Sequence, residues 1–140
     1  MRIVYFEVEG EAMYKRVLVP VDGSEIAERA LDEAINLTKG HKVELKIVFI
    51  GSDDESSREV IEVAMNRAVN AGLQPESGLL GKFETEEIAD VILQEVKEWA
   101  ADLIVMATHG RRGVAHMILG SVTEGVIRAA PVPVLVIRGA

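Results

Sequence analysis

The sequence predicts a single-domain, doubly wound α/β/α sandwich whose parallel sheet is covered by helices on both faces. Its 140 residues suit one domain. Hydrophobic residues make up 49% of the chain, which is enough for one sizeable core. Short apolar runs rich in valine and isoleucine alternate with amphipathic segments. A strand followed by a helix occurs four times before a last strand, and this order is typical of a parallel sheet.

The first half of the chain contains a leading segment, two strands and two helices. Residues 1–12 alternate loosely and predict an N-terminal extension or an extra strand ahead of the domain at 13–140. Pro20 is tolerated in the first strand because it lies near the end of the apolar run. The predicted elements are a strand at 17–21, a helix capped by Ser24 and closed by Gly40, a strand at 43–50, a loop at 52–57 and a helix at 58–71.

The second half continues the alternation and closes on an apolar strand. Thr85 is expected to cap a helix, because two glutamates follow it and favour the positive end of that helix. Ser121 and Glu124 have the spacing of a capping box, which predicts that Ser121 opens the last helix. The predicted elements are a strand at 77–82, a helix from Thr85 to Trp99, a strand at 103–107, a helix from Ser121 to Pro131 and a strand at 133–137.

Composition excludes several classes of function. Fifteen lysines and arginines against 23 aspartates and glutamates give a net charge of −8, so a broad nucleic-acid or membrane surface is not expected. The absence of cysteine excludes thiolate metal sites and cysteine nucleophiles. No apolar stretch has the roughly 18 residues that a membrane span needs. The expected location is the cytoplasm.

Polar and small residues follow two of the predicted strands. Asp22 ends the first strand, and a glycine-containing loop follows the fourth. In open parallel sheets ligands bind beyond the carboxyl ends of the strands. Gly110 and Gly120 allow the backbone to approach an anion, Ser121 and Thr123 add hydroxyl donors, and Gly120 directly precedes the predicted helix start. Residues 103–123 carry a charge of +2 and the rest carries −10, so this loop suits phosphate, whereas Asp22 suits ribose hydroxyls.

Each of these residues also has a purely structural interpretation. Asp22 would cap the turn after its strand, and the glycines would form turns. Ser121 and Glu124 would cap a helix with or without a phosphate. The sequence lacks both the P-loop motif and G-x-G-x-x-G, and it offers no committed catalytic base and no metal-ligand cluster. Arg111 and Arg112 either touch phosphate or only keep the surface soluble.

From residue 13 to 137 the sequence resembles the universal stress protein family. Residues 15–24 are similar to the family's first strand and turn, and Gly110, nine residues and then Gly120-Ser121 match the end of the motif of its nucleotide-binding branch. The first glycine of that motif is replaced by Ala107, which keeps the position beside the ribose small. The resemblance implies a five-stranded parallel sheet in the order 3-2-1-4-5, a homodimer, and ATP or another adenine nucleotide as ligand. It also implies Asp22 at the ribose and the Val48 backbone at the adenine edge. The site residues that it implies are Pro20, Asp22, Val48, Ala107, Gly110, Gly120, Ser121, Val122 and Thr123.

The expected function is therefore a nucleotide-binding module with a regulatory or stress-response role. A slow ATPase or phosphotransferase, and a dimerisation module without a ligand, are the alternatives. Mg²⁺ is expected to arrive with a triphosphate and to be held mainly by its oxygens. The apolar strand at 132–137 is expected at a sheet edge, where two copies would pair antiparallel. The alternative is that residues 3–8 cover this edge and leave a monomer.

Overall fold

The computed structural model describes residues 7–8, 11–108 and 116–138. Its main sheet has five parallel strands in the order β5-β4-β3-β6-β7. Counted from the first strand of the domain this is the order 3-2-1-4-5, so the predicted doubly wound fold is confirmed. The strands are β3 (Arg16–Pro20), β4 (Glu44–Ile50), β5 (Glu76–Leu80), β6 (Leu103–Thr108) and β7 (Val134–Arg138). The helices are α1 (Glu25–Thr38), α2 (Glu55–Asn70), α3 (Ile88–Trp99) and α4 (His116–Ala129).

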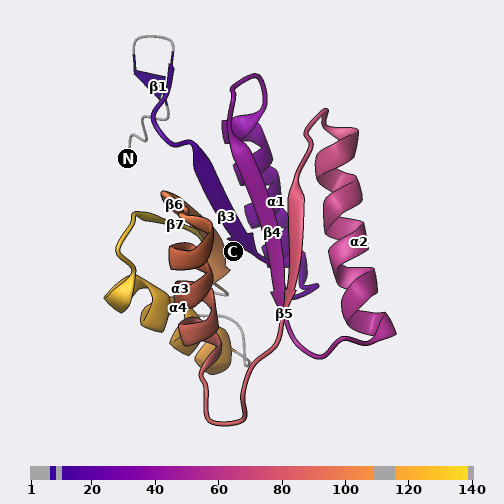
Figure 1. Ribbon diagram of the computed structural model, residues 1–140, viewed down its shortest axis with the longest axis vertical. Helices are drawn as coiled ribbons and strands as arrows, with labels where there is room; N and C mark the ends of the chain where they lie inside the picture. The colour runs from indigo at the N-terminus through magenta and orange to yellow at the C-terminus, as the bar shows by residue number, and fades with distance from the viewer. Residues whose placement is uncertain (1–6, 9–10, 109–115, 139–140) are drawn as a thin grey trace.

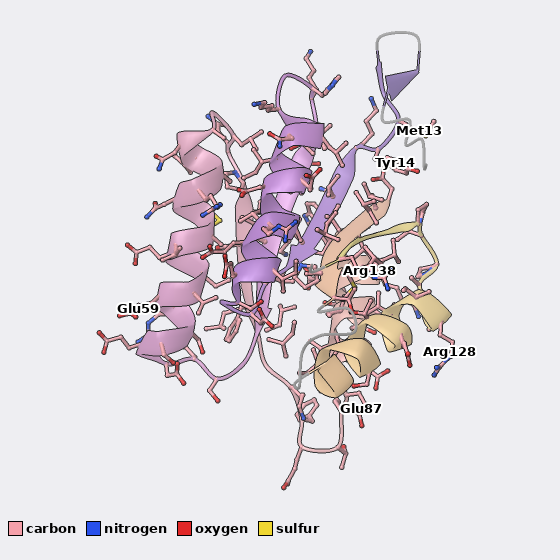
Figure 2. All side chains as sticks on the ribbon, turned by 180° about the vertical axis from the view of Figure 1, so that it is seen from behind. Met13, Tyr14, Glu59, Glu87, Arg128 and Arg138 are labelled. Carbon is pink, nitrogen blue, oxygen red and sulfur yellow. The ribbon has the colours of Figure 1, made fainter. Side chains whose placement is uncertain are left out.

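The sheet is covered on both faces, as its continuous apolar strands predict. One core lies under α1 and α2 and includes Val17 and Val19 of β3. The other lies under α3 and α4 and includes Leu18 of β3 and Val126 of α4. Figure 1 shows α3 and α4 together on one side, and Figure 2, seen from behind, shows α1 in front of the sheet. Successive side chains of a strand point to opposite faces, so β3 contributes to both cores.

The N-terminal segment contains two short strands that do not join the main sheet. β1 (Glu7–Val8) pairs antiparallel with β2 (Glu11–Ala12) as a separate two-stranded sheet. Figure 1 shows β1 projecting beyond the start of β3. β7 lies at the edge of the main sheet, as predicted, and neither β1 nor β2 pairs with it.

Three helices, α2, α3 and α4, begin at other residues than predicted. α2 starts three residues earlier than the predicted Arg58, because the carboxylate of Asp54 accepts a hydrogen bond from the Ser57 amide at 2.8 Å and caps the helix. The predicted loop at 52–57 is therefore helical from Glu55 onward. α3 is preceded by Glu87, which forms a capping box with Asp90, so the prediction that Thr85 caps this helix was wrong.

The largest correction concerns α4, which begins at His116. Gly120 and Ser121 therefore lie inside the helix, and Ser121 is not its cap as the spacing to Glu124 predicted. The amides without an intrahelical partner are those of the first turn, which ends before Gly120. The capping-box pattern predicted the wrong helix start, because the apolar residues ahead of Gly120 are compatible with helix as well as with loop.

Gly125 brings α3 and α4 close together, and its replacement should be costly. A Cβ at position 125 would lie only 2.9 Å from the Cβ of Ala89 on α3, so Gly125→Ala must push the helices apart. We expect a loss of about 1–3 kcal/mol in the free energy of unfolding, measured by urea titration.

Gly120→Ala is the matched control for Gly125→Ala on the same helix. No described atom lies within 4 Å of a Cβ at position 120, so this variant should gain up to about 1 kcal/mol from helix propensity. Equal stability of the two variants would contradict the close packing of α3 on α4.

Candidate nucleotide site

A cavity of about 300 Å³ opens at the carboxyl ends of the central strands. This is where the fold class places ligands, at the point where the winding direction reverses. Its walls come from the end of β3, the start of α1, the ends of β4 and β6, the first turns of α3, and α4. The lining residues are Pro20, Val21, Asp22, Ser24, Ile26, Ala27, Phe49, Ile50, Ile88, Ile92, Met106, Ala107 and Val122.

The cavity lies where β3 and β6 stop pairing. Within these two fully described strands the register joins Val17 to Leu103 and Leu18 to Ile104 and then ends. On its other side β3 stays paired with β4 as far as Pro20, which lies opposite Val48. The pairing of β3 with β4 therefore reaches the last residue of β3, whereas its pairing with β6 stops two residues earlier.

Asp22 and Ser24 form the turn that connects β3 to α1. Oδ1 of Asp22 accepts a hydrogen bond from the Ser24 amide at 2.9 Å, and Oγ of Ser24 accepts one from the Ala27 amide at 3.2 Å. The predicted cap of α1 is thereby confirmed, and Asp22 has the turn role that was its structural alternative. Because Asp22 is exposed and lines the cavity, its carboxylate is also accessible to a ligand.

The predicted motif residues on α4 face two directions. Val122 lines the cavity, whereas Gly120 and Thr123 line a separate groove between α4 and β7. Thr123 is 4% exposed, and its hydroxyl donates a hydrogen bond to the carbonyl of Ala107 at 3.2 Å. This hydrogen bond links a residue of the cavity wall, Ala107, to a residue of the groove wall, Thr123. Ser121 is exposed on the same helix.

Val48 is not brought to the cavity. Its side chain is fully buried in the core under α3, and its carbonyl accepts a hydrogen bond from the Val21 amide at 2.8 Å. The next two residues of β4, Phe49 and Ile50, line the cavity instead. Gly110, Arg111 and Arg112 lie outside the described residues.

The apolar walls of the cavity carry no polar motif by which the sequence would indicate a binding site. Ile88 and Ile92 recur at helical spacing in α3, and Met106 lies in the apolar run of β6, so the sequence pattern alone favours the core for all three residues. The sequence signal that could have found these residues is their position. They lie at the carboxyl end of a strand or in the first turns of the helix that faces it, which is where ligands bind in this fold class.

The lining is mostly apolar and contains one ionisable side chain, that of Asp22, among the described residues. Such a cavity suits a flat apolar group that carries hydroxyls at one end. No group of three potential metal ligands gathers in the part of the chain that the structure describes. None of the described helices combines the length and the apolar character that a membrane crossing requires.

Comparisons with known proteins agree with this geometry. The family model described as the universal stress protein family matches residues 13–138. Universal stress protein MJ0531 of Methanocaldococcus jannaschii is 34% identical over 92% of this chain and 85% of its own length. Universal stress protein YxiE of Bacillus subtilis is 31% identical over 90% of this chain and 100% of its own length.

Two solved structures share the fold. A universal stress protein in complex with cAMP has a TM-score of 0.76 and 26% identity, covering 91% of this chain and 98% of that one. A universal stress protein from Archaeoglobus fulgidus in complex with dAMP has a TM-score of 0.71 and 27% identity, covering 89% and 98%. The family model spans the whole five-stranded domain and leaves out only the N-terminal segment and the last two residues, so this chain belongs to the universal stress protein family.

Proposed function

We propose that the protein binds an adenine nucleotide, with ATP as the first candidate, in the cavity at the carboxyl ends of β3 and β6. The observation that carries this proposal is the apolar cavity with Asp22 at its rim. Two structurally similar family members were solved in complex with cAMP and dAMP, which supports an adenine nucleotide. The base would occupy the apolar part, between Phe49 and Ile50 of β4 and Ile92 of α3.

The ribose and phosphates would extend toward α4. Asp22 would accept hydrogen bonds from ribose hydroxyls with the oxygen that the Ser24 amide does not use. The phosphates would run past Ala107 and Val122 toward Gly120 and Ser121 of α4. Gly120 leaves open space, because no described atom lies within 4 Å of a Cβ at that position.

The biological role that follows is regulatory. A cytoplasmic protein that retains a nucleotide in a cavity with one carboxylate would report on nucleotide levels during stress instead of turning the nucleotide over quickly. Mg²⁺ would be bound by the oxygens of a triphosphate. Calorimetric titration with ATP, ADP, AMP and cAMP tests the proposal, and failure of all four to bind would overturn it.

Asp22→Asn should separate the turn role from the ribose role. The amide oxygen of asparagine can still accept the hydrogen bond from the Ser24 amide, but the negative charge is lost. We expect ATP affinity to fall about tenfold to hundredfold, while competition by inorganic triphosphate stays unchanged, because the carboxylate is assigned to ribose. Parent-like ATP affinity would leave Asp22 as a turn residue alone.

Gly120→Val should obstruct the phosphates without unfolding the protein. The branched side chain would fill the open space beside α4, and calorimetry should then show loss of ATP binding with an unchanged circular dichroism spectrum. Ala129→Val, at the exposed far end of the same helix, is the control and should bind normally. Equal affinity of the two variants would argue against phosphates at Gly120.

We also propose a homodimer through β7 and the apolar residues of the groove beside it, and not through the space at Gly120 that the phosphates would use. β7 leaves one edge of the sheet open, and Val132, Val134, Val136 and Ile127 line the groove next to it. Ile127 is 53% exposed. The charged residues among the described groove lining are Glu124 and Arg138, whose charges are opposite, so two copies can meet here without a surplus of one charge. Figure 2 shows Arg128 pointing outward from α4 and Arg138 at the end of β7.

Val136→Lys should dissociate this dimer. Val136 lines the groove, so a lysine there would place a charge in the paired face, whereas Leu135 packs into the core under α1 and is unsuitable for the test. Sedimentation equilibrium should show a dimer for the full chain and a monomer for the variant. A version that starts at Met13 should remain a dimer, because β1 and β2 do not pair with β7. A full-length monomer that associates only after this truncation would support the covered edge instead.

A further inference from the structure

We infer that Pro20 is a positioning residue: because it has no amide hydrogen, it ends the β3–β6 ladder and keeps the cavity between these strands open. The effect on nucleotide binding rests on the proposed function. The effect on the β3–β6 pairing rests only on the hydrogen bonds of β3. Pro20 lies at the last position of β3 and lines the cavity.

Backbone hydrogen bonds establish which neighbouring strand each residue of β3 faces. The carbonyl of Lys15 accepts from the Glu44 amide at 2.9 Å, and the amide of Val21 donates to the Val48 carbonyl at 2.8 Å, so these odd positions face β4. The carbonyl of Arg16 accepts from the amide of Asp102, the residue directly before β6, at 2.9 Å, so the even positions face β6. Position 20 is even. The donor that proline lacks is therefore the one that would reach β6 and not the one that would reach β4.

The strand register shows that the missing donor of Pro20 lies at the cavity. Continued by two residues, the β3–β6 register would set Pro20 opposite Met106, and the next residue of β6 is Ala107. The ladder instead ends at Leu18 and Ile104, and Pro20, Met106 and Ala107 line the cavity. A missing donor within a parallel ladder stops its pairing on one side, which leaves the two strands free to part.

Pro20 therefore shapes the site through the backbone as well as through its ring. A residue with an amide at this position would extend the ladder toward Met106 and draw the two strands together. The gain of a backbone hydrogen bond would stabilise the fold, and the narrower cavity would accept the nucleotide base less well. The cavity therefore exists at the expense of backbone hydrogen bonds between β3 and β6.

Pro20→Val tests the inference because valine keeps an apolar side chain and adds the amide. We expect a slowly exchanging amide at position 20 by hydrogen-exchange NMR, a higher urea midpoint, and ATP affinity at least about tenfold weaker by calorimetry. Pro133→Val is the matched control: Pro133 directly precedes β7, and its carbonyl accepts from the Ile104 amide at the far side of β6, so ATP affinity should not change.

The outcomes separate the alternatives. If Pro20 serves only as an apolar contact, Pro20→Val binds ATP as the parent does, and the inference is overturned. Fast exchange of the new amide together with an unchanged urea midpoint overturns it as well, because the ladder has then not extended. If the parent binds none of the nucleotides, the proposed function fails, while the exchange rate and the urea midpoint still decide whether Pro20 holds the strands apart.

Discussion

The alternating direction of side chains and backbone groups along β3 is the constraint on which the rest of the structure depends. Val17, Leu18 and Val19 are all fully buried, yet they enter different cores: the valines lie under α1 and α2, and the leucine lies under α3 and α4. The same alternation directs hydrogen bonds to β4 and β6 in turn. One strand of five residues therefore joins both halves of the sheet and both helical layers.

The two ends of the β3–β6 pair are built differently. At the amino end the carboxylate of Asp102 accepts hydrogen bonds from the amides of Lys15 and Arg16 at 2.8 and 2.9 Å. The Arg16 guanidinium lies 4.9 Å from the centre of the Trp99 ring and donates to the Trp99 carbonyl. Its hydrogen bond to Glu44 holds the pKa of that carboxyl below its usual value. The strands are thus held together at the amino end, and their pairing stops before the other end, where the cavity lies.

α4 is shared by the cavity and the groove. Val122 faces the cavity and Thr123, the next residue, faces the groove, while the Thr123 hydroxyl holds the helix to the end of β6. Gly125 lets the same helix approach α3. The residues from Gly120 to Gly125 therefore line the cavity, line the groove and allow α4 to pack on α3. This explains why the pattern from Gly120 to Thr123 resembles a ligand motif and a helix cap at the same time.

The sequence by itself determined the fold class, the cap at Ser24 and the edge position of β7, because these follow from the order and periodicity of the elements and from turn chemistry. The family resemblance implied the strand order. It also brought Pro20, Asp22, Ala107 and Val122 forward as site residues. Only the tertiary structure decided that Phe49 and Ile50 replace Val48 in the cavity, that α4 begins at His116, and that Gly120 and Thr123 line a groove beside β7. The physical reason is that cavity walls and helix starts depend on where neighbouring strands stop pairing and on which elements pack against them, and neither is encoded in any one segment of the chain.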